Sequence, residues 1–125
     1  MERTVLVVDD SATMRMSLKA TLEMHQFHVQ TAENGSAALE WFRTTHEPPD
    51  VVITDVHMPV MDGLTFIQQL RALPQGRFLP ILVLTTDSQE ERRQEARRLG
   101  ATGWIIKPVS GSDLIAVIDK VLPKH

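Results

Sequence analysis

Four short apolar runs in this chain each end in side chains that can do chemistry. The runs end in Asp9 and Asp10, in Asp55, in Thr85 and in Lys107. Carboxylates crowded beside an ammonium and a hydroxyl can bind a hard divalent cation and can act on a phosphoryl group. These residues can form one functional site only if the fold brings the ends of the four runs together.

The runs are typical of strands buried on both faces of a parallel sheet, because they lack polar alternation. Stretches with helical spacing separate them, as parallel strands require. Ligands of open α/β sheets bind beyond the carboxyl ends of the strands. We therefore predict an α/β protein, a doubly wound sheet of five parallel strands with five helices, whose reactive residues share one crevice. The strands are expected at Val5–Val8, Val51–Ile53, Ile81–Leu84 and Trp104–Ile106, with a weaker one at Phe27–Ala32.

Capping residues and apolar spacing place the five helices. We expect a capping box of Ser88 with Glu91 to start the fourth helix, and Gly100 to end it. Between Gln89 and Arg98 this helix has only one apolar residue, an alanine, so we expect it to be the most loosely held. For most of its charged residues, considered one at a time, the simplest explanation is a place on a solvent-exposed face of the helix. The helices are expected to start at Asp10 or Ser11, at Ser36, after Asp62, at Ser88 and at Ser110.

The composition of the 125-residue chain is that of one soluble globular domain, with 42% hydrophobic and 23% charged residues. The net charge of −3 argues against binding nucleic acid by bulk charge. The absence of cysteine excludes disulfides and thiolate metal sites and favours a reducing cytosol. No apolar stretch approaches the ~20 residues of a membrane span. We expect a cytoplasmic monomer with one domain over residues 1–125, no output domain, and no nucleic-acid or membrane partner.

The carboxylates of Asp9, Asp10 and Asp55 come together if the first and third predicted strands are neighbours. At ~4–5 Å such charges repel strongly in a partly dehydrated crevice. An all-oxygen set with few protein ligands suits Mg²⁺, which keeps several waters. A carboxylate beside Mg²⁺ and the ammonium of Lys107 is placed to attack phosphorus. Each residue alone could be an N-cap or a strand end, but their joint placement on four strands favours a site.

With these residues assembled, the chain resembles the receiver domains of response regulators, and among them the single-domain regulators of chemotaxis. The resemblance covers the whole chain and implies the flavodoxin-like strand order 2-1-3-4-5, which is a property of the family. It is carried by Val-Val-Asp-Asp-Ser (7–11), Thr-Asp-Val-His-Met-Pro-Val-Met-Asp-Gly (54–63), Pro-Ile-Leu-Val-Leu-Thr (80–85) and Gly-Trp-Ile-Ile-Lys-Pro (103–108).

The resemblance implies a role for each site residue. Asp55 would accept a phosphoryl group from a histidine kinase or a small phosphodonor. Lys107 would pair with that group, and its bond to Pro108 is expected to be cis. Thr85 would be the switch hydroxyl that moves toward the phosphoryl group. The implied ligands of Mg²⁺ are Asp10, Asp55, the backbone carbonyl of His57 and, through water, Asp9.

Further positions are implied to shape the response. Trp104 stands where receiver domains usually carry a Tyr or Phe that turns inward with the switch hydroxyl, although a Trp packed on its strand is the alternative. His57 and Asp87 would overlook the acyl phosphate and tune its lifetime, and Thr86 would narrow access to it. The output face is expected on residues 88–99, 103–106 and 110–122.

Three functions compete for this site. The first is a phosphorylation-controlled switch, not an enzyme, whose partners are a histidine kinase, a target such as a flagellar motor switch protein, and a phosphatase. The second is a phosphorelay intermediate or phosphate sink without a motor target. A phosphohydrolase of the haloacid dehalogenase kind is disfavoured, because Asp55 lacks an Asp two residues later. A nucleotide enzyme would need the glycine-rich P-loop, which is missing.

Overall fold

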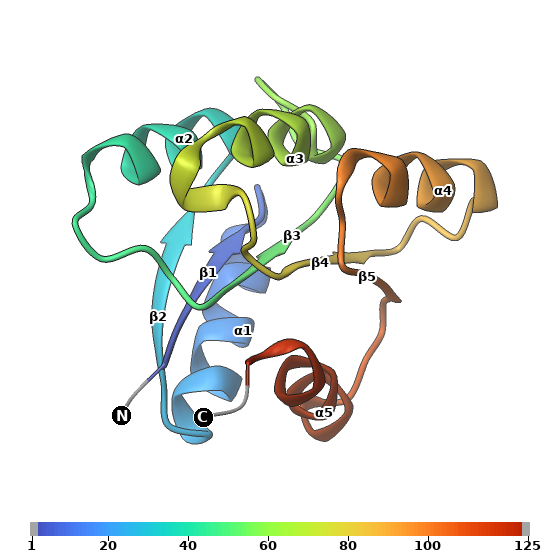
Figure 1. Cartoon of the computed structure of the whole chain (residues 1–125). Coiled ribbons are helices and arrows are strands. Elements are labelled where there is room, and N and C mark those ends of the chain that lie inside the picture. Colours follow the sequence, from blue (N-terminus) through green and yellow to red (C-terminus); the bar gives the residue numbers. More distant parts are fainter. Residues whose placement is uncertain (1–2, 124–125) are drawn as a thin grey trace.

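The structure, a computed structural model, describes residues 3–123, so Met1, Glu2, Lys124 and His125 of the expected domain lie outside the described residues. Five parallel strands form one sheet in the order β2-β1-β3-β4-β5 (Figure 1). This order confirms the predicted doubly wound, flavodoxin-like α/β fold. The strands are β1 (Arg3–Val8), β2 (Phe27–Ala32), β3 (Val51–Thr54), β4 (Ile81–Thr85) and β5 (Gly103–Ile106).

Helices cover both faces of the sheet, with α1 and α5 on one face and α2, α3 and α4 on the other (Figure 1). Successive side chains of a strand point to opposite faces, so the sheet supplies two separate apolar clusters. In β1, for example, Leu6 packs toward α2 and α3, whereas Val7 packs toward α1 and α5. The helices are α1 (Ala12–Met24), α2 (Gly35–Thr44), α3 (Gly63–Ala72), α4 (Glu90–Leu99) and α5 (Gly111–Val121), with a 3-10 turn η1 (Pro74–Gly76).

The burial of the strands follows their place in the sheet. Every residue of β3 and β4 is buried, as predicted for strands covered on both faces. The same expectation is wrong for Trp104–Ile106, because β5 is an edge strand that has a neighbour on one side only. Ile106 is 41% exposed. The last strand therefore presents apolar surface beside the site.

Three of the predicted helix starts are confirmed by their capping bonds. The side chains of the N-cap residues accept backbone N–H groups three residues ahead, which stabilises the first helical turn. These N-caps are Ser11, Asp62 and Ser110. The second helix starts one residue earlier than predicted, because Asn34 accepts the N–H of Ala37 at 2.8 Å and the helix begins at Gly35 rather than Ser36.

The predicted capping box of Ser88 with Glu91 is wrong. The helix α4 begins at Glu90, and Gln89 at its N-cap makes no capping bond with its side chain. Instead, the Gln89 N–H donates to Asp87 Oδ1 at 2.8 Å. The capping box would need a different donor, the N–H of Glu91 for Ser88 Oγ, and the N-cap lies one residue later than predicted, at Gln89.

No helix within residues 3–123 is both long enough and apolar enough to cross a membrane.

Candidate functional site

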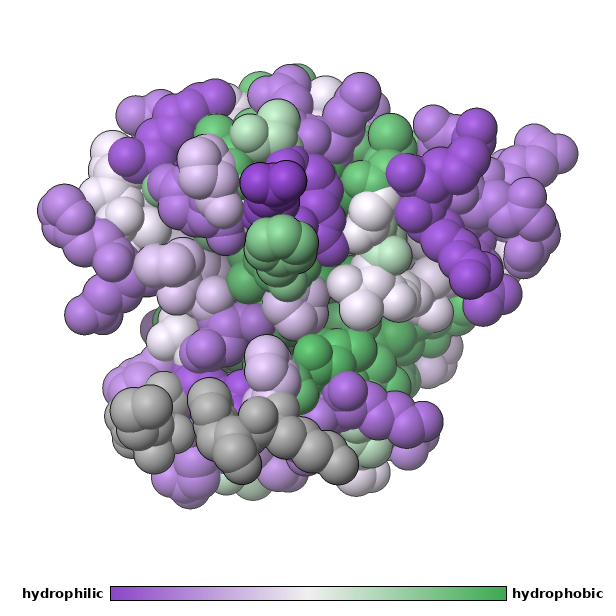
Figure 2. All heavy atoms as spheres, viewed as in Figure 1, coloured by the Kyte–Doolittle hydropathy of each residue, from purple (hydrophilic) through white to green (hydrophobic). Residues whose placement is uncertain are grey.

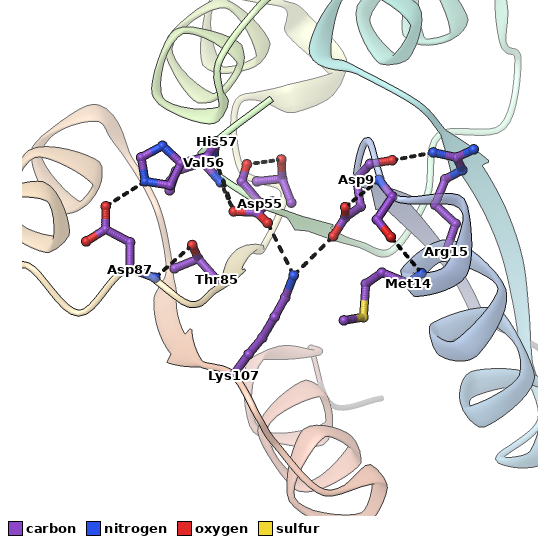
Figure 3. Close-up of polar contacts among 11 residues, drawn as sticks. Asp9, Met14, Arg15, Asp55, Val56, His57, Thr85, Asp87 and Lys107 are labelled. Carbon is purple, nitrogen blue, oxygen red and sulfur yellow. Dashed lines mark hydrogen bonds and ion pairs between the residues drawn. The ribbon is translucent and has the colours of Figure 1, made fainter. Parts of the chain in front are cut away.

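The parallel pairing of the strands brings the predicted site residues to one edge of the sheet. The end of β1 lies beside the end of β3, where Val8 pairs with Thr54, and the end of β4 lies beside the end of β5. The side chains of Asp9, Asp55 and Lys107 consequently converge above this edge (Figure 3).

Lys107 joins the buried carboxylate of Asp9 and the partly buried carboxylate of Asp55. Its Nζ donates to Asp9 Oδ2 at 3.3 Å and to Asp55 Oδ2 at 3.2 Å. The side chains of Lys107 and Asp55 are each 13% exposed and that of Asp9 is 5% exposed, so water screens these charges poorly. The second oxygen of Asp9, Oδ1, accepts the N–H of Ser11 at 2.9 Å. One ammonium thus balances part of the negative charge that two carboxylates bring into the crevice.

The backbone around Asp55 holds its carboxylate in place. Asp55 Oδ1 accepts the N–H of Val56 at 2.6 Å and that of His57 at 3.3 Å. Behind it, α3 begins so close that a Cβ on Gly63 would lie 2.1 Å from the carbonyl oxygen of Asp55. Only glycine allows this approach. Asp55 therefore presents Oδ2 toward Lys107 from a fixed position.

Asp10 lies apart from this ion pair network. It is exposed at the start of the loop after β1, whereas Asp9 is buried. In the part of the chain that the structure describes, no group of three acidic or histidine side chains is arranged to hold a metal ion. The implied ligand set needs only two direct carboxylates with a backbone carbonyl, and Mg²⁺ in proteins keeps several waters. A cluster of three side chains is consequently not a requirement for that set.

Thr85 and Thr86, adjacent in sequence, face different surroundings. Thr85 is fully buried at the end of β4, and its Oγ1 accepts the N–H of Asp87 at 3.2 Å. A hydroxyl that accepts one bond keeps its own hydrogen for a second partner. Thr86 is exposed and lines a groove of about 410 Å³ between α1 and α5, next to Lys107 and Pro108. The peptide bond between these last two residues is cis, as the resemblance implies.

Asp87 connects its own loop with three other segments, which are the loop after β3, the start of α4 and the strand β5. Its Oδ2 accepts from His57 Nε2 at 2.7 Å and from Arg92 Nε at 3.0 Å, and its Oδ1 accepts the N–H of Gln89. The N–H of Gln89 and the bond from His57 hold the pKa of the Asp87 carboxyl below its usual range. The carbonyl oxygen of Asp87 accepts from Trp104 Nε1 at 3.0 Å. His57 and Asp87, singled out separately from the sequence, therefore form a contact pair (Figure 3).

The side chain of Trp104 is partly buried. It packs against the apolar cluster beneath α2, α3 and α4, and its indole N–H is engaged with Asp87. The ring thus connects β5 with the loop that leads into α4. Its rotation during switching stays a prediction.

Two arginines at the site were not identified from the sequence. Arg15 donates from Nη1 to the carbonyl oxygen of Asp9 at 2.6 Å, and Arg92 pairs with Asp87. In the sequence, Arg92 is one of the charged residues of a helix face that solvent exposure explains. The local pattern of a carboxylate shortly before a helix and an arginine early in it fits Arg93 as well as Arg92, so it does not identify this second pair.

Comparison with known proteins places these contacts in a family. The sequence model described as "Response regulator receiver domain" matches residues 5–119. The chain belongs to this family. Receiver domains are signalling switches of two-component systems, which in general interact with a histidine kinase and with downstream targets.

Relatives of this receiver domain match it over nearly the whole chain. Protein PilH of Pseudomonas aeruginosa is 36% identical over 94% of this chain and 96% of its own. The structure of the chemotaxis protein CheY4 of Vibrio cholerae is similar with a TM-score of 0.91, at 39% identity over 98% of this chain and 100% of that one. The receiver domain of the sensor histidine kinase PA1611 of Pseudomonas aeruginosa, with a magnesium ion in its active-site cleft, has a TM-score of 0.88 at 22% identity, covering 96% of this chain and 97% of its own. This last likeness concerns the fold alone.

Proposed function

We propose that the protein is a phosphorylation-controlled switch whose acceptor is Asp55. The observation that carries the proposal is the fixed contact of Asp55 Oδ2 with Lys107 Nζ in a crevice shared with Asp9. A carboxylate oxygen of Asp55 attacks the phosphorus of the donor. The bond from phosphorus to the rest of the donor breaks, and its electron pair leaves with that group. Lys107 then balances negative charge on the transferred group, where poor screening strengthens the attraction.

Mg²⁺ fits the charges of this site. The carboxylates of Asp9, Asp10 and Asp55 bring three negative charges, and Lys107 balances one of them. A divalent cation would balance the other two, and oxygen donors are its preferred ligands. The proposed ligands are the carboxylates of Asp10 and Asp55 with the backbone carbonyl of His57, while Asp9 acts through water. When bound, the ion would supply charge neutralisation to the transferring oxygens.

The switch itself is proposed to begin at Thr85. Its hydroxyl hydrogen can be donated to a phosphoryl oxygen on Asp55, which would draw the side chain inward and weaken its bond from the N–H of Asp87. Trp104, bonded to the carbonyl oxygen of the same Asp87, would follow this change. The output face is proposed on α4, β5 and α5, because α4 follows the loop of Asp87, β5 carries Trp104, and α5 comes directly after β5 along the chain.

The partners are proposed in the same terms. A histidine kinase would supply the phosphoryl group, a target such as a flagellar motor switch protein would bind the output face, and a phosphatase would reset the switch.

We propose a cytoplasmic, monomeric, single-domain regulator that assists its own phosphorylation and dephosphorylation but turns over no outside substrate. His57, Asp87 and Thr86 would set the lifetime of the phosphoryl group. A phosphorelay intermediate or phosphate sink shares this chemistry without the motor target.

Labelling by acetyl phosphate with Mg²⁺, followed by intact-mass spectrometry, tests the acceptor. Asp55→Asn should abolish the labelling because an amide is not a comparable nucleophile. Asp119→Asn makes the same change on the exposed face of α5 and should be labelled like the wild type. Undiminished labelling of Asp55→Asn would exclude Asp55 as the acceptor.

Binding of a target separates the switch from the phosphate sink. In a pull-down of purified candidate motor proteins, the labelled wild type should bind more strongly than Asp55→Asn. Equal binding by the two proteins would exclude the phosphorylation-controlled switch and favour the phosphate sink.

A further inference from the structure

Asp9 is held by bonds to its backbone and to both of its carboxylate oxygens. Its N–H donates to the carbonyl oxygen of Ala32 at the end of β2, at 3.2 Å. Its carboxylate accepts the N–H of Ser11 and the ammonium of Lys107. Its carbonyl oxygen accepts from Arg15 Nη1 at 2.6 Å (Figure 3). Asp9 is therefore anchored to β2, to α1 and to the loop that follows β5.

The next residue, Asp10, differs from Asp9 in its contacts. Asp10 is exposed, and within residues 3–123 its carboxylate makes no hydrogen bond and no ion pair. Asp9 and Asp55, in contrast, both pair with Lys107. The carboxylate of Asp10 can therefore give both of its oxygens to a cation without first leaving a partner in this part of the chain.

Arg15 binds the peptide group that joins these two acids, from the first turns of α1. A guanidinium pairs most strongly with a carboxylate, but Arg15 forms no ion pair in the described part of the chain and donates to a neutral carbonyl oxygen instead. A peptide group is planar, so a bond to the Asp9 carbonyl oxygen also fixes the N–H and the Cα of Asp10. Arg15 thus restricts where the Asp10 carboxylate can lie and occupies neither of its oxygens.

We propose that Arg15 is a positioning residue for the divalent cation, which fixes the peptide between Asp9 and Asp10 and so places the Asp10 carboxylate for metal binding. The inference rests on the proposed Mg²⁺ site and extends that site to α1, none of whose side chains is a proposed ligand. Groups that hold metal ligands in place contribute to affinity, because a ligand that is already fixed loses less freedom when the ion binds.

Positioning and charge make opposite predictions for Arg15. Its positive charge repels a cation, so removal of the charge alone should strengthen the binding of Mg²⁺. Loss of its bond to the Asp9 carbonyl oxygen should instead weaken the binding, because the Asp10 carboxylate is then no longer held in one place. The direction of the change therefore separates the proposed role from a general electrostatic effect.

Calorimetric titration of the metal-free protein with Mg²⁺ measures this direction. Arg15→Met should bind Mg²⁺ roughly tenfold more weakly than the wild type, the lower end of the effect of losing such a supporting group. Arg15→Lys keeps the charge and one donor, so it should show a smaller loss of affinity, and this loss cannot be electrostatic.

The matched control is Lys19→Met, which removes the same charge from an exposed position one turn further along α1. It should bind Mg²⁺ as the wild type does or slightly more tightly. Arg15→Met and Arg15→Lys proteins that bind Mg²⁺ as tightly as Lys19→Met would overturn the proposal.

The dynamics of the metal-free protein give a second readout. The Asp10 N–H lies in the same plane as the carbonyl group that Arg15 binds, so its NMR order parameter should fall in Arg15→Met and stay unchanged in Lys19→Met. The N–H of Val8, inside β1, should keep its value in both variants, which excludes a general loosening of the fold. An unchanged order parameter for Asp10 in Arg15→Met contradicts the proposal whatever the metal affinity. Absence of Mg²⁺ binding by the wild type would instead contradict the metal site on which the proposal rests.

Discussion

The two helices beside β5, α4 and α5, are held to the sheet in different ways. α5 buries Leu114 and Ile118, and Leu122 just after it is also buried, whereas α4 buries only Ala96. Hydrophilic residues accordingly dominate the surface over α4, and hydrophobic residues show between α4 and α5 (Figure 2). Apolar burial holds α5 along its length. The comparison indicates that α5 is the fixed part of the proposed output face and α4 the part that can move.

Polar contacts at the two ends of α4 replace the missing apolar face. At its start Arg92 pairs with Asp87, and at its end Arg71 of α3 donates to the carbonyl oxygen of Gly100 at 2.6 and 3.1 Å. Gly100 ends the helix as predicted, with a φ of 113° that favours glycine. Directional bonds of this kind exchange with water at small net cost. They therefore suit an element that changes position, since switching elements have low local stability.

The largest expected effect comes from removing an apolar contact of α5. Ile118→Ala should lower the free energy of unfolding by about 2–5 kcal/mol, because the cavity adds to the lost burial. On α4, Ala96→Gly should cost only about 1 kcal/mol, mostly through helix propensity. Urea denaturation measures both. An α4 substitution as costly as that in α5 would contradict the comparison.

Arg71→Lys should weaken the end of α4. Arg71 donates to the carbonyl oxygens of Gly76, Leu79 and Gly100, which a single ammonium cannot reach together. Partly desolvated carbonyls left without donors should cost about 1–3 kcal/mol in the urea midpoint analysis. Arg77→Lys, on the exposed loop after η1, is the matched control and should be neutral.

A smaller effect is expected from acid. The pKa of Asp87 is held low in the folded protein, so its bonds stabilise the fold above the ordinary aspartate pKa, and this stabilisation is lost as the pH falls through the lowered value. Thermal melts should therefore show that Asp87→Asn loses less stability than the wild type below about pH 4. Parallel pH profiles for the two proteins would argue that Asp87 carries no such contact.

The smallest effect is spectroscopic. In Trp41→Phe, Trp104 is the only indole, and its fluorescence should change when beryllium trifluoride and Mg²⁺ are added. The reason is its bond to Asp87, which lies beside the switch hydroxyl. An unchanged spectrum, together with normal target binding by Thr85→Ala, would mean that Trp104 only packs on β5.

The sequence predicted the site because each of its main residues ends a strand. Asp55 and Lys107 could be placed from local pattern alone, since all parallel strands of one sheet end at the same edge. The exposure of Ile106 could not, because it depends on β5 lying at the edge of the sheet. The capping box predicted at Ser88 was wrong as well. The helix starts one residue later than the box requires, and Asp87, just before it, is held by contacts from distant segments.

Local sequence patterns could not predict the contacts that hold α4. Arg71 looks like any polar residue near the end of its helix, and its pKa is lowered by a burial that only the packed loops create. Arg92 lies in a run of charges in which nothing but the position of Asp87 distinguishes it from Arg93. Sequence patterns thus predicted the strands and their reactive ends, while the polar attachment of α4 required the packed structure.

The most direct test of the account is amide hydrogen exchange of α4 and α5 with and without beryllium trifluoride and Mg²⁺, a mimic of the phosphoryl group on Asp55. The account predicts that exchange changes in α4 and at Trp104 and stays the same in α5, and that Asp55→Asn shows no change anywhere. Equal changes in both helices, or changes confined to α5, would contradict the claim that α4 is the moving part of the switch.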